Sequence, residues 1–255
     1  MTRVLVPLAI LEGESVSTGL PTLLATMDVT VLGYHVLPEQ TPPDQARLQY
    51  EDRATEALVD LEAAFEAAGG SADHRLVFTH DREQTIDRVA DETAADAYAI
   101  TGTTGPVDRL LVALTGDVAV DRITSFVTEL IGDREIGVTL VLATDDERHG
   151  QDVLEAAADP LTERGIDVAT ELMVDEPPLE ALLAAATGHD AIVMCEQAPS
   201  LRSFLLGEEA ERVAAESVGP VLVVRRHRDD AATAQERPED DSADRPSRPD
   251  DSSKS

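Results

Sequence analysis

Several residue types are scarce in this sequence, and each shortage excludes a class of protein. Lys254 is the only lysine, and 20 basic residues stand against 51 acidic ones, for a formal net charge of −31. A surface this negative repels phosphate backbones and anionic lipids, so neither nucleic acid nor a membrane surface is expected as a partner. Cys195 is the only cysteine, so no disulfide can form within the chain, which favours a reducing, cytoplasmic location.

Aromatic residues and long apolar runs are also scarce. Aromatics make up 3% of the chain and tryptophan is absent, so the core has to be built from Val, Leu, Ile and Ala. The hydrophobic share of 42% is enough for a sizeable core. No stretch approaches the roughly 18 apolar residues of a membrane span, and the N-terminal residues do not form a secretion signal, so no direct membrane insertion is expected.

The acidic, lysine-poor composition predicts a protein adapted to a high-salt interior, as in a halophile. At about 1 M salt the Debye length falls to about 3 Å, so like charges on the surface repel each other little. Attraction of a basic protein partner is the alternative interpretation of the same charge.

Short apolar runs alternate with helical patterns along the chain, which is typical of an α/β fold with a parallel sheet covered on both faces. The strand-like runs of the first part lie at residues 3–10, 29–37, 74–79 and 96–101, with helices expected at 44–68 and 81–95. A second series places strands at 109–114, 137–143, 166–174, 190–195 and 218–224, with helices at 118–131, 151–164 and 179–187. Residues 201–217 are expected to hold a loop and a helix. Pro160 is expected to break or kink the end of its helix.

The second series repeats the first with a period of roughly 105 residues. RVLVPL at 3–8 corresponds to RLLVAL at 109–114, and DAYAIT at 96–101 to DAIVMC at 190–195. We therefore predict two domains, 1–106 and 107–228, of which the first lacks a fifth strand. Residues 229–255 have almost no large apolar residues, which predicts a disordered acidic tail.

The residues of the second half resemble those of the universal stress protein family. The resemblance rests on RLLVALTGD at 109–117, DAIVM at 190–194, SLRSFLLG at 200–207 and PVLVV at 220–224, in that order. It extends less strongly over the first half. The resemblance implies two Rossmann-like parallel-sheet domains in tandem, each with strand order 3-2-1-4-5. We expect the strand at Val218–Val224 to pair either between the two units or between two chains, since in related proteins that edge mediates dimerisation.

The nucleotide-binding motif of that family is degenerate here. In nucleotide-binding members an Asp ends the first strand and a Gly-x2-Gly-x9-Gly-Ser/Thr loop wraps the phosphates. Thr115 occupies the Asp position of the second half and Ala9 that of the first half. Gly207 is followed by Glu208 instead of Ser or Thr. Counting back from Gly207, the two earlier glycines fall on Met194 and Gln197, or on Cys195 and Ala198 after a one-residue slip. Carboxylates at a helix start repel phosphate, so weak or no ATP binding is expected.

Three further places in the sequence contain candidate site residues. Gly102 and Gly105 supply a Gly-x2-Gly after the fourth strand, which fits either an interdomain turn or a phosphate loop. Ser200, Arg202 and Ser203 could hold a small anion at the sheet edge, or Arg202 could pair with a neighbouring Glu. Cys195 ends a strand and is expected to be a small buried hydrophobe. The six histidines fall in separate elements, so no metal site is expected.

These features predict a non-catalytic regulatory or interaction protein, since no nucleophile–base pair can be named. One alternative is a stress sensor that binds ATP or AMP through the loops just described. Another is a soluble regulatory subunit of a membrane transporter, which some relatives of the family resemble. The expected partner is a second copy of the chain or another protein.

Overall fold

The computed structural model describes residues 2–114, 120–195 and 219–225, and in these ranges it forms one nine-stranded sheet. The site candidates Thr115, Ser200, Arg202, Ser203 and Gly207 lie outside the described residues, as do the helix expected at 201–217 and the acidic tail. The strands are β1 Arg3–Ala9, β2 Asp28–Val36, β3 Ser71–Thr79, β4 Ala97–Ile100, β5 Arg109–Leu114, β6 Gly137–Thr144, β7 Val168–Val174, β8 Ala191–Cys195 and β9 Val221–Val224.

The strand order across the sheet is β3-β2-β1-β4-β9-β8-β5-β6-β7. Counted from within each half, this is 3-2-1-4 for β1–β4 and 3-2-1-4-5 for β5–β9, and every pairing is parallel except that of β4 with β9. The predicted fold class is therefore confirmed, including the missing fifth strand of the N-terminal half. The two sheets are not separate, however, because β9 joins them into one.

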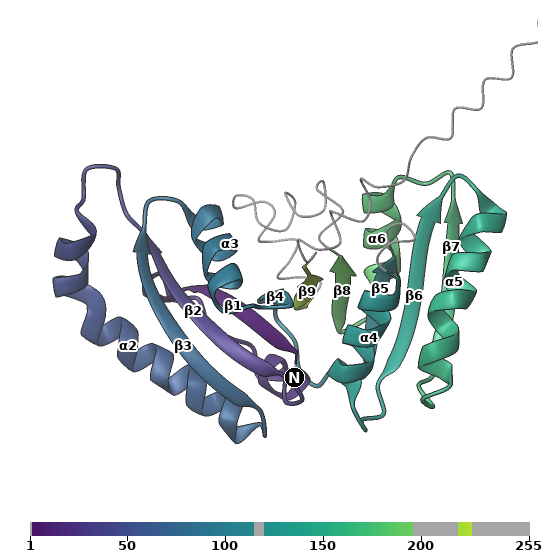
Figure 1. Ribbon diagram of the computed structural model, residues 1–255, viewed down its shortest axis with the longest axis horizontal. Coiled ribbons are helices and arrows are strands. Elements are labelled where there is room, and N and C mark those ends of the chain that lie inside the picture. Colours follow the sequence, from purple (N-terminus) through teal and green to yellow (C-terminus); the bar gives the residue numbers. More distant parts are fainter. Residues whose placement is uncertain (1, 115–119, 196–218, 226–255) are drawn as a thin grey trace, which may run out of the picture.

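Helices cover both faces of the sheet, and the two hydrophobic cores extend across both halves. The helices are α1 Gly19–Leu23, α2 Pro43–Ala67, α3 Arg82–Glu92, α4 Val120–Ile131, α5 Glu147–Thr162 and α6 Pro178–Ala186, with a short 3-10 turn at Ile10–Glu12. Residues of α1, α2, α4 and α5 share one core, and those of α3 and α6 share the other. Figure 1 shows the halves splayed as a V, with the N-terminus at its base and α3 and α6 on its concave side.

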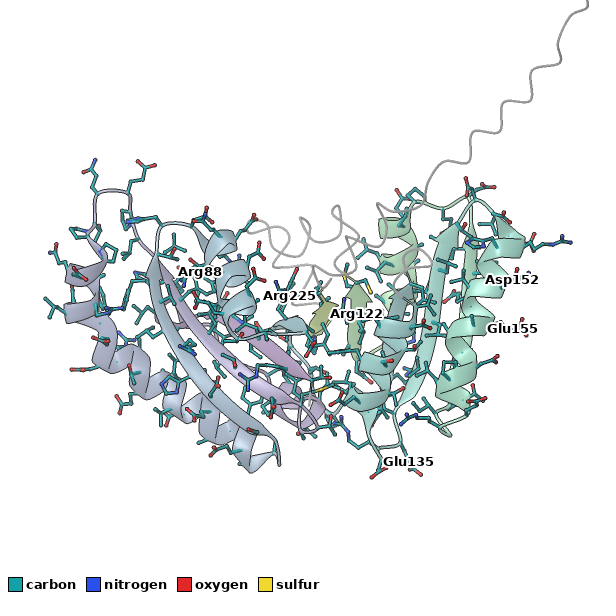
Figure 2. All side chains as sticks on the ribbon, viewed as in Figure 1. Arg88, Arg122, Glu135, Asp152, Glu155 and Arg225 are labelled. Atoms are coloured by element: carbon teal, nitrogen blue, oxygen red, sulfur yellow. The ribbon has the colours of Figure 1, made fainter. Side chains whose placement is uncertain are left out.

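Strand β9 has neighbours on both edges. It runs parallel to β8, with Cys195 opposite Val224, and antiparallel to β4, with Ile100 opposite Val221. Arg225, which lies between the halves in Figure 2, donates to Asp91 at 2.6 Å and to the Ala95 carbonyl at 3.0 Å and so holds β9 against the end of α3. Strand β9 is thus paired between the two halves of the chain, which confirms the first of the two expected pairings. A dimer through Val218–Val224 stays a prediction, and it would require the edge of β9 that β4 occupies here.

The boundary predicted at residues 106 and 107 falls in the connection between β4 and β5. The sheet and both cores continue across that connection. The division into domains 1–106 and 107–228 stays a prediction.

Helix α5 differs from the expected helix both at its start and near its end, for identifiable reasons. Helix α5 begins at Glu147 instead of Gln151, because the Asp146 side chain accepts the amide hydrogen of His149 at 3.0 Å and caps the helix. The break expected at Pro160 does not occur, and the helix continues to Thr162. Proline in the last turn removes a single helical hydrogen bond, a smaller loss than in the middle of a helix.

The repeat seen in the sequence has a structural counterpart at the start of β4 and β8. The Asp96 carboxylate accepts the amide of Arg3 at 3.0 Å, and the Asp96 amide donates to the Arg3 carbonyl at 2.8 Å. Asp190 makes the same pair of bonds with Arg109, both at 2.9 Å. Each aspartate therefore sets the register between the fourth and first strands of its half.

Candidate functional site

The carboxyl end of β1 is where the sequence pattern would place an adenosine contact in the N-terminal half. Strand β1 ends at Ala9, and Gly13, at φ +83°, turns the chain back after the 3-10 turn. The Glu14 carboxylate then accepts the Ala9 amide at 2.5 Å. Sequence reasoning considered only Ala9 here and missed Glu14. Gly13, shortly after the end of the strand, was the one signal that the chain returns to the strand end.

The Gly102–Gly105 loop is packed against the protein's own backbone. A Cβ atom added to Gly102 would lie 2.2 Å from the Gly219 carbonyl oxygen, just before β9. A Cβ added to Gly19 would lie 1.8 Å from the Gly105 carbonyl oxygen, whereas Gly105 itself has open space around it. Gly102 and Gly19 are thus required for close chain crossings. Backbone occupies the space beside Gly102, as an interdomain turn would require, and the phosphate-loop alternative stays a prediction.

Cys195 is 3% exposed and belongs to the core that β9 shares with α4 and α5. Cys195, at the carboxyl end of β8, pairs with Val224 at one end of β9. Ile100, at the carboxyl end of β4, pairs with Val221 at the other end of β9. These ends are separated by roughly 10 Å along the strand. The structure therefore does not bring Cys195 together with Gly102 and Gly105, and the candidates form two separate places.

The base of the V carries polar contacts between the halves that the sequence did not indicate. The guanidinium of Arg134 donates to the carbonyl oxygens of Thr22 at 2.5 Å and Leu23 at 2.9 Å, at the end of α1. It also donates to the carbonyls of Leu130 and Ile131 at the end of α4. One cation thus caps the negative ends of two helices from different halves. Burial lowers the pKa of Arg134 from its ordinary value, and arginine stays charged all the same.

A second contact at the base joins the start of β1 to α4. The Glu129 carboxylate accepts the Thr2 amide at 3.0 Å and the Thr2 hydroxyl at 2.5 Å. The hydrogen bond from the Thr2 hydroxyl lowers the pKa of Glu129 from its ordinary value of 4.5. Both bonds need the ionised carboxylate as an acceptor, so protonation of Glu129 weakens the junction.

Lowering the pH should therefore destabilise the wild-type protein, because it removes the contribution of the ionised Glu129 carboxylate. The variant Glu129→Gln lacks this contribution at every pH. A carboxyl whose pKa is lowered by folding stabilises the protein above its unfolded pKa and loses that effect as pH falls through the folded pKa. We expect the difference in unfolding free energy between wild type and Glu129→Gln to be largest near neutral pH and to shrink towards about pH 3. Urea unfolding at both pH values measures it. A difference that stays constant over this range would contradict the assignment.

No family model matches the sequence. No curated protein matches it either. Among solved structures, a universal stress protein from Archaeoglobus fulgidus DSM 4304 superposes with a TM-score of 0.63 at 19% sequence identity, covering 89% of this chain and 97% of that one. The chain shares the fold of that universal stress protein.

Two further solved structures resemble the chain more loosely. A protein of the universal stress protein family from Burkholderia pseudomallei is 26% identical, with a TM-score of 0.36 over 46% of this chain and 96% of that one. The cytoplasmic domain of a prokaryotic cation chloride cotransporter is 11% identical, with a TM-score of 0.46 over 87% of this chain and 94% of that one. Superpositions this loose do not bear on function.

The described residues contain neither a membrane-spanning helix nor a cluster of metal ligands. Within residues 2–114, 120–195 and 219–225, no helix is long and apolar enough to cross a membrane. The same residues contain no group of three or more His, Cys, Asp or Glu side chains placed to hold a metal ion.

Proposed function

We propose that the protein is a universal stress protein-like regulatory protein that acts through protein contacts, without catalysis and with weak or no ATP binding. The observation that carries the proposal is the packing of Gly102 against the Gly219 backbone. In the N-terminal half, the one glycine pattern suited to a phosphate loop is used to bring β9 into the sheet.

Charge supports the same proposal. The Glu14 carboxylate lies at the end of β1, and the sequence places Glu208 and Glu209 directly after Gly207. The phosphates of a nucleoside triphosphate would be repelled by these carboxylates in either half, and the whole chain has a net charge of −31. Coulomb repulsion and the absence of a free glycine loop in the N-terminal half both oppose tight phosphate binding.

Isothermal titration calorimetry with ATP and with AMP, each with Mg²⁺ in molar KCl, tests the proposal. We expect no saturable heat, and no adenine nucleotide in the supernatant when the freshly purified protein is denatured and analysed by mass spectrometry. Micromolar binding of either nucleotide would contradict the proposal.

The variant Arg202→Gln distinguishes the alternative of a nucleotide sensor. If ATP binds and Arg202→Gln abolishes binding, the site lies in the C-terminal half at Ser200–Ser203. Arg148→Gln, at an exposed arginine on α5, is the control for a general change in charge.

A membrane transporter is one class of partner that the sequence resemblance implies, and co-purification with a transporter tests it separately.

A further inference from the structure

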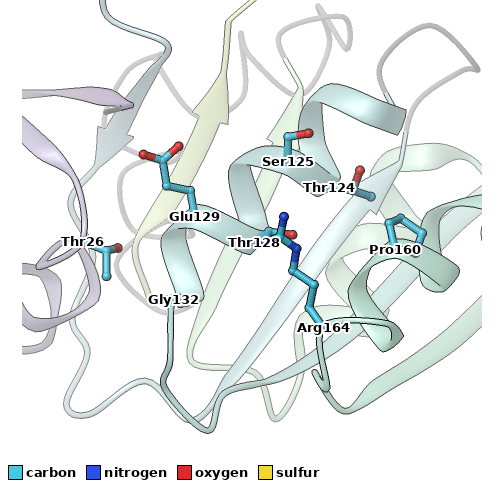
Figure 3. A pocket seen from close by; sticks show the side chains of 8 residues that line it. All are labelled: Thr26, Thr124, Ser125, Thr128, Glu129, Gly132, Pro160 and Arg164. Carbon is cyan, nitrogen blue, oxygen red and sulfur yellow. The ribbon is translucent and has the colours of Figure 1, made fainter.

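A groove of about 540 Å³ lies between α4 and the C-terminal end of α5, on the core face opposite α3 and α6. Thr26 of the N-terminal half lines one side, and Pro160 and Arg164 line the other (Figure 3). Its volume is in the range of small-molecule sites in proteins. None of the described site residues expected from the sequence lines this groove.

Hydroxyl groups line the groove along α4. The side chains of Ser125 and Thr128 form no hydrogen bond with any residue that the structure describes. Thr124 and Thr26 each donate to a backbone carbonyl at 2.9 Å and keep lone pairs that can accept. Serine and threonine are poorer helix formers than Ala, Leu or Glu. The stability of α4 therefore does not explain why these residues lie together where α4 lines the groove.

One full negative and one full positive charge flank these hydroxyls. Figure 3 shows Glu129 and Arg164 on either side of Thr128. Glu129 is ionised, because the Thr2 hydroxyl lowers its pKa. Arg164 forms no ion pair within the described part of the chain. The lining therefore has no net charge but has two separated poles.

We propose that this groove binds a small zwitterion of the amino-acid type. Its carboxylate would pair with Arg164 and the hydroxyls of Ser125 and Thr128, and its ammonium would face Glu129. Charge-assisted hydrogen bonds of this kind are among the stronger ones available to a small ligand. A nucleotide or free phosphate fits poorly because Glu129 repels it. This inference does not depend on the proposed function.

A bound zwitterion would touch both halves of the sheet, because Thr26 comes from the N-terminal half and the remaining lining from the C-terminal half. The groove also adjoins the Arg134 contacts, which end at Leu130 and Ile131. Binding should therefore raise the resistance of the junction to unfolding as well as occupy the groove.

Two-dimensional amide NMR on the full chain tests the proposal, with glycine, L-alanine, L-serine and L-glutamine as probes and with glycerol and inorganic phosphate as comparison compounds. We expect at least one amino acid to cause saturable shifts at Ser125, Thr128 and Arg164, and glycerol and phosphate to cause none. Saturable shifts with glycerol or phosphate alone would overturn the zwitterion assignment, and no saturable shift with any probe would overturn the site.

Two variants at exposed positions locate the binding. Arg164→Gln should weaken amino-acid binding by about tenfold or more, as expected when a hydrogen bond to a charged group is lost. Ser125→Leu should block the groove and abolish the shifts. Arg148→Gln removes the same charge near the start of α5, whereas Arg164 follows the end of that helix, and it should leave binding unchanged. Equal losses for Arg164→Gln and Arg148→Gln, or full binding by Ser125→Leu, would each overturn the proposal.

Discussion

Replacing Gly102 with alanine is expected to lower the free energy of unfolding by about 3 kcal/mol, the upper end of the cost of overpacking a tight site. The new methyl group would lie 2.2 Å from the Gly219 carbonyl oxygen and 2.3 Å from its carbon, so backbone atoms have to move. Because Gly219 leads into β9, the displacement affects the strand that joins the two halves. Urea unfolding of the purified variant measures the loss.

Gly105→Ala is the matched control, in the same loop and with the same chemical change. Nothing lies within 4 Å of the added Cβ, so the change in stability should stay within about 0.5 kcal/mol. The pair also separates two interpretations of the loop. In a phosphate loop both glycines would matter for nucleotide binding, whereas in a packed turn only Gly102 matters, and for folding. Equal effects of the two substitutions on stability would contradict the packing argument.

Removal of the Arg134 side chain should have an effect of similar size at the base of the V. Arg134→Ala leaves four helix-end carbonyls, two from each half, without the guanidinium that donates to them. Hydrogen bonds to charged groups contribute about 1.5–3 kcal/mol each and do not add fully, so we expect a loss of about 3 kcal/mol. Arg148→Ala, at an exposed site on α5, should change stability by less than about 0.5 kcal/mol.

A second measurement distinguishes loss of this contact from general destabilisation. Hydrogen exchange should accelerate first at the end of α1, near Thr22, and at the end of α4, near Ile131, before it does so in the strands. Arg134→Lys should recover only part of the stability, because an ammonium cannot reach both helix ends as the planar fork does. Full recovery by lysine, or uniform acceleration over the whole sheet, would contradict the proposed role.

Local patterns were reliable guides to the elements of this protein. The short apolar runs predicted all nine strands, and the corresponding segments DAYAIT and DAIVMC begin with the two aspartates that set strand register in the structure. The strand order within each half followed from the resemblance that these runs carry. Such predictions succeed because burial on both faces of a parallel sheet requires continuous β-branched and aliphatic runs, which are visible in one dimension.

The candidate site was less predictable. Gly102 and Gly105 look equivalent in the sequence, and only the approach of Gly219 shows that one is constrained and the other is not. Glu14 was missed because a carboxylate five residues past a strand end carries no periodic signal. The groove along α4 was missed because its residues come from three separate segments of the chain.

The sequence by itself determined the α/β class, the duplicated strand series, the extra strand of the second half and the acidic, lysine-poor surface. Tertiary structure alone decided that β9 serves both halves, that Arg134 caps two helices at once and that hydroxyls and opposite charges line one groove. The physical reason is that hydrophobic periodicity is local, whereas the pairing of strand edges, the capping of helix ends by a distant side chain and the closing of a groove depend on which segments meet in space.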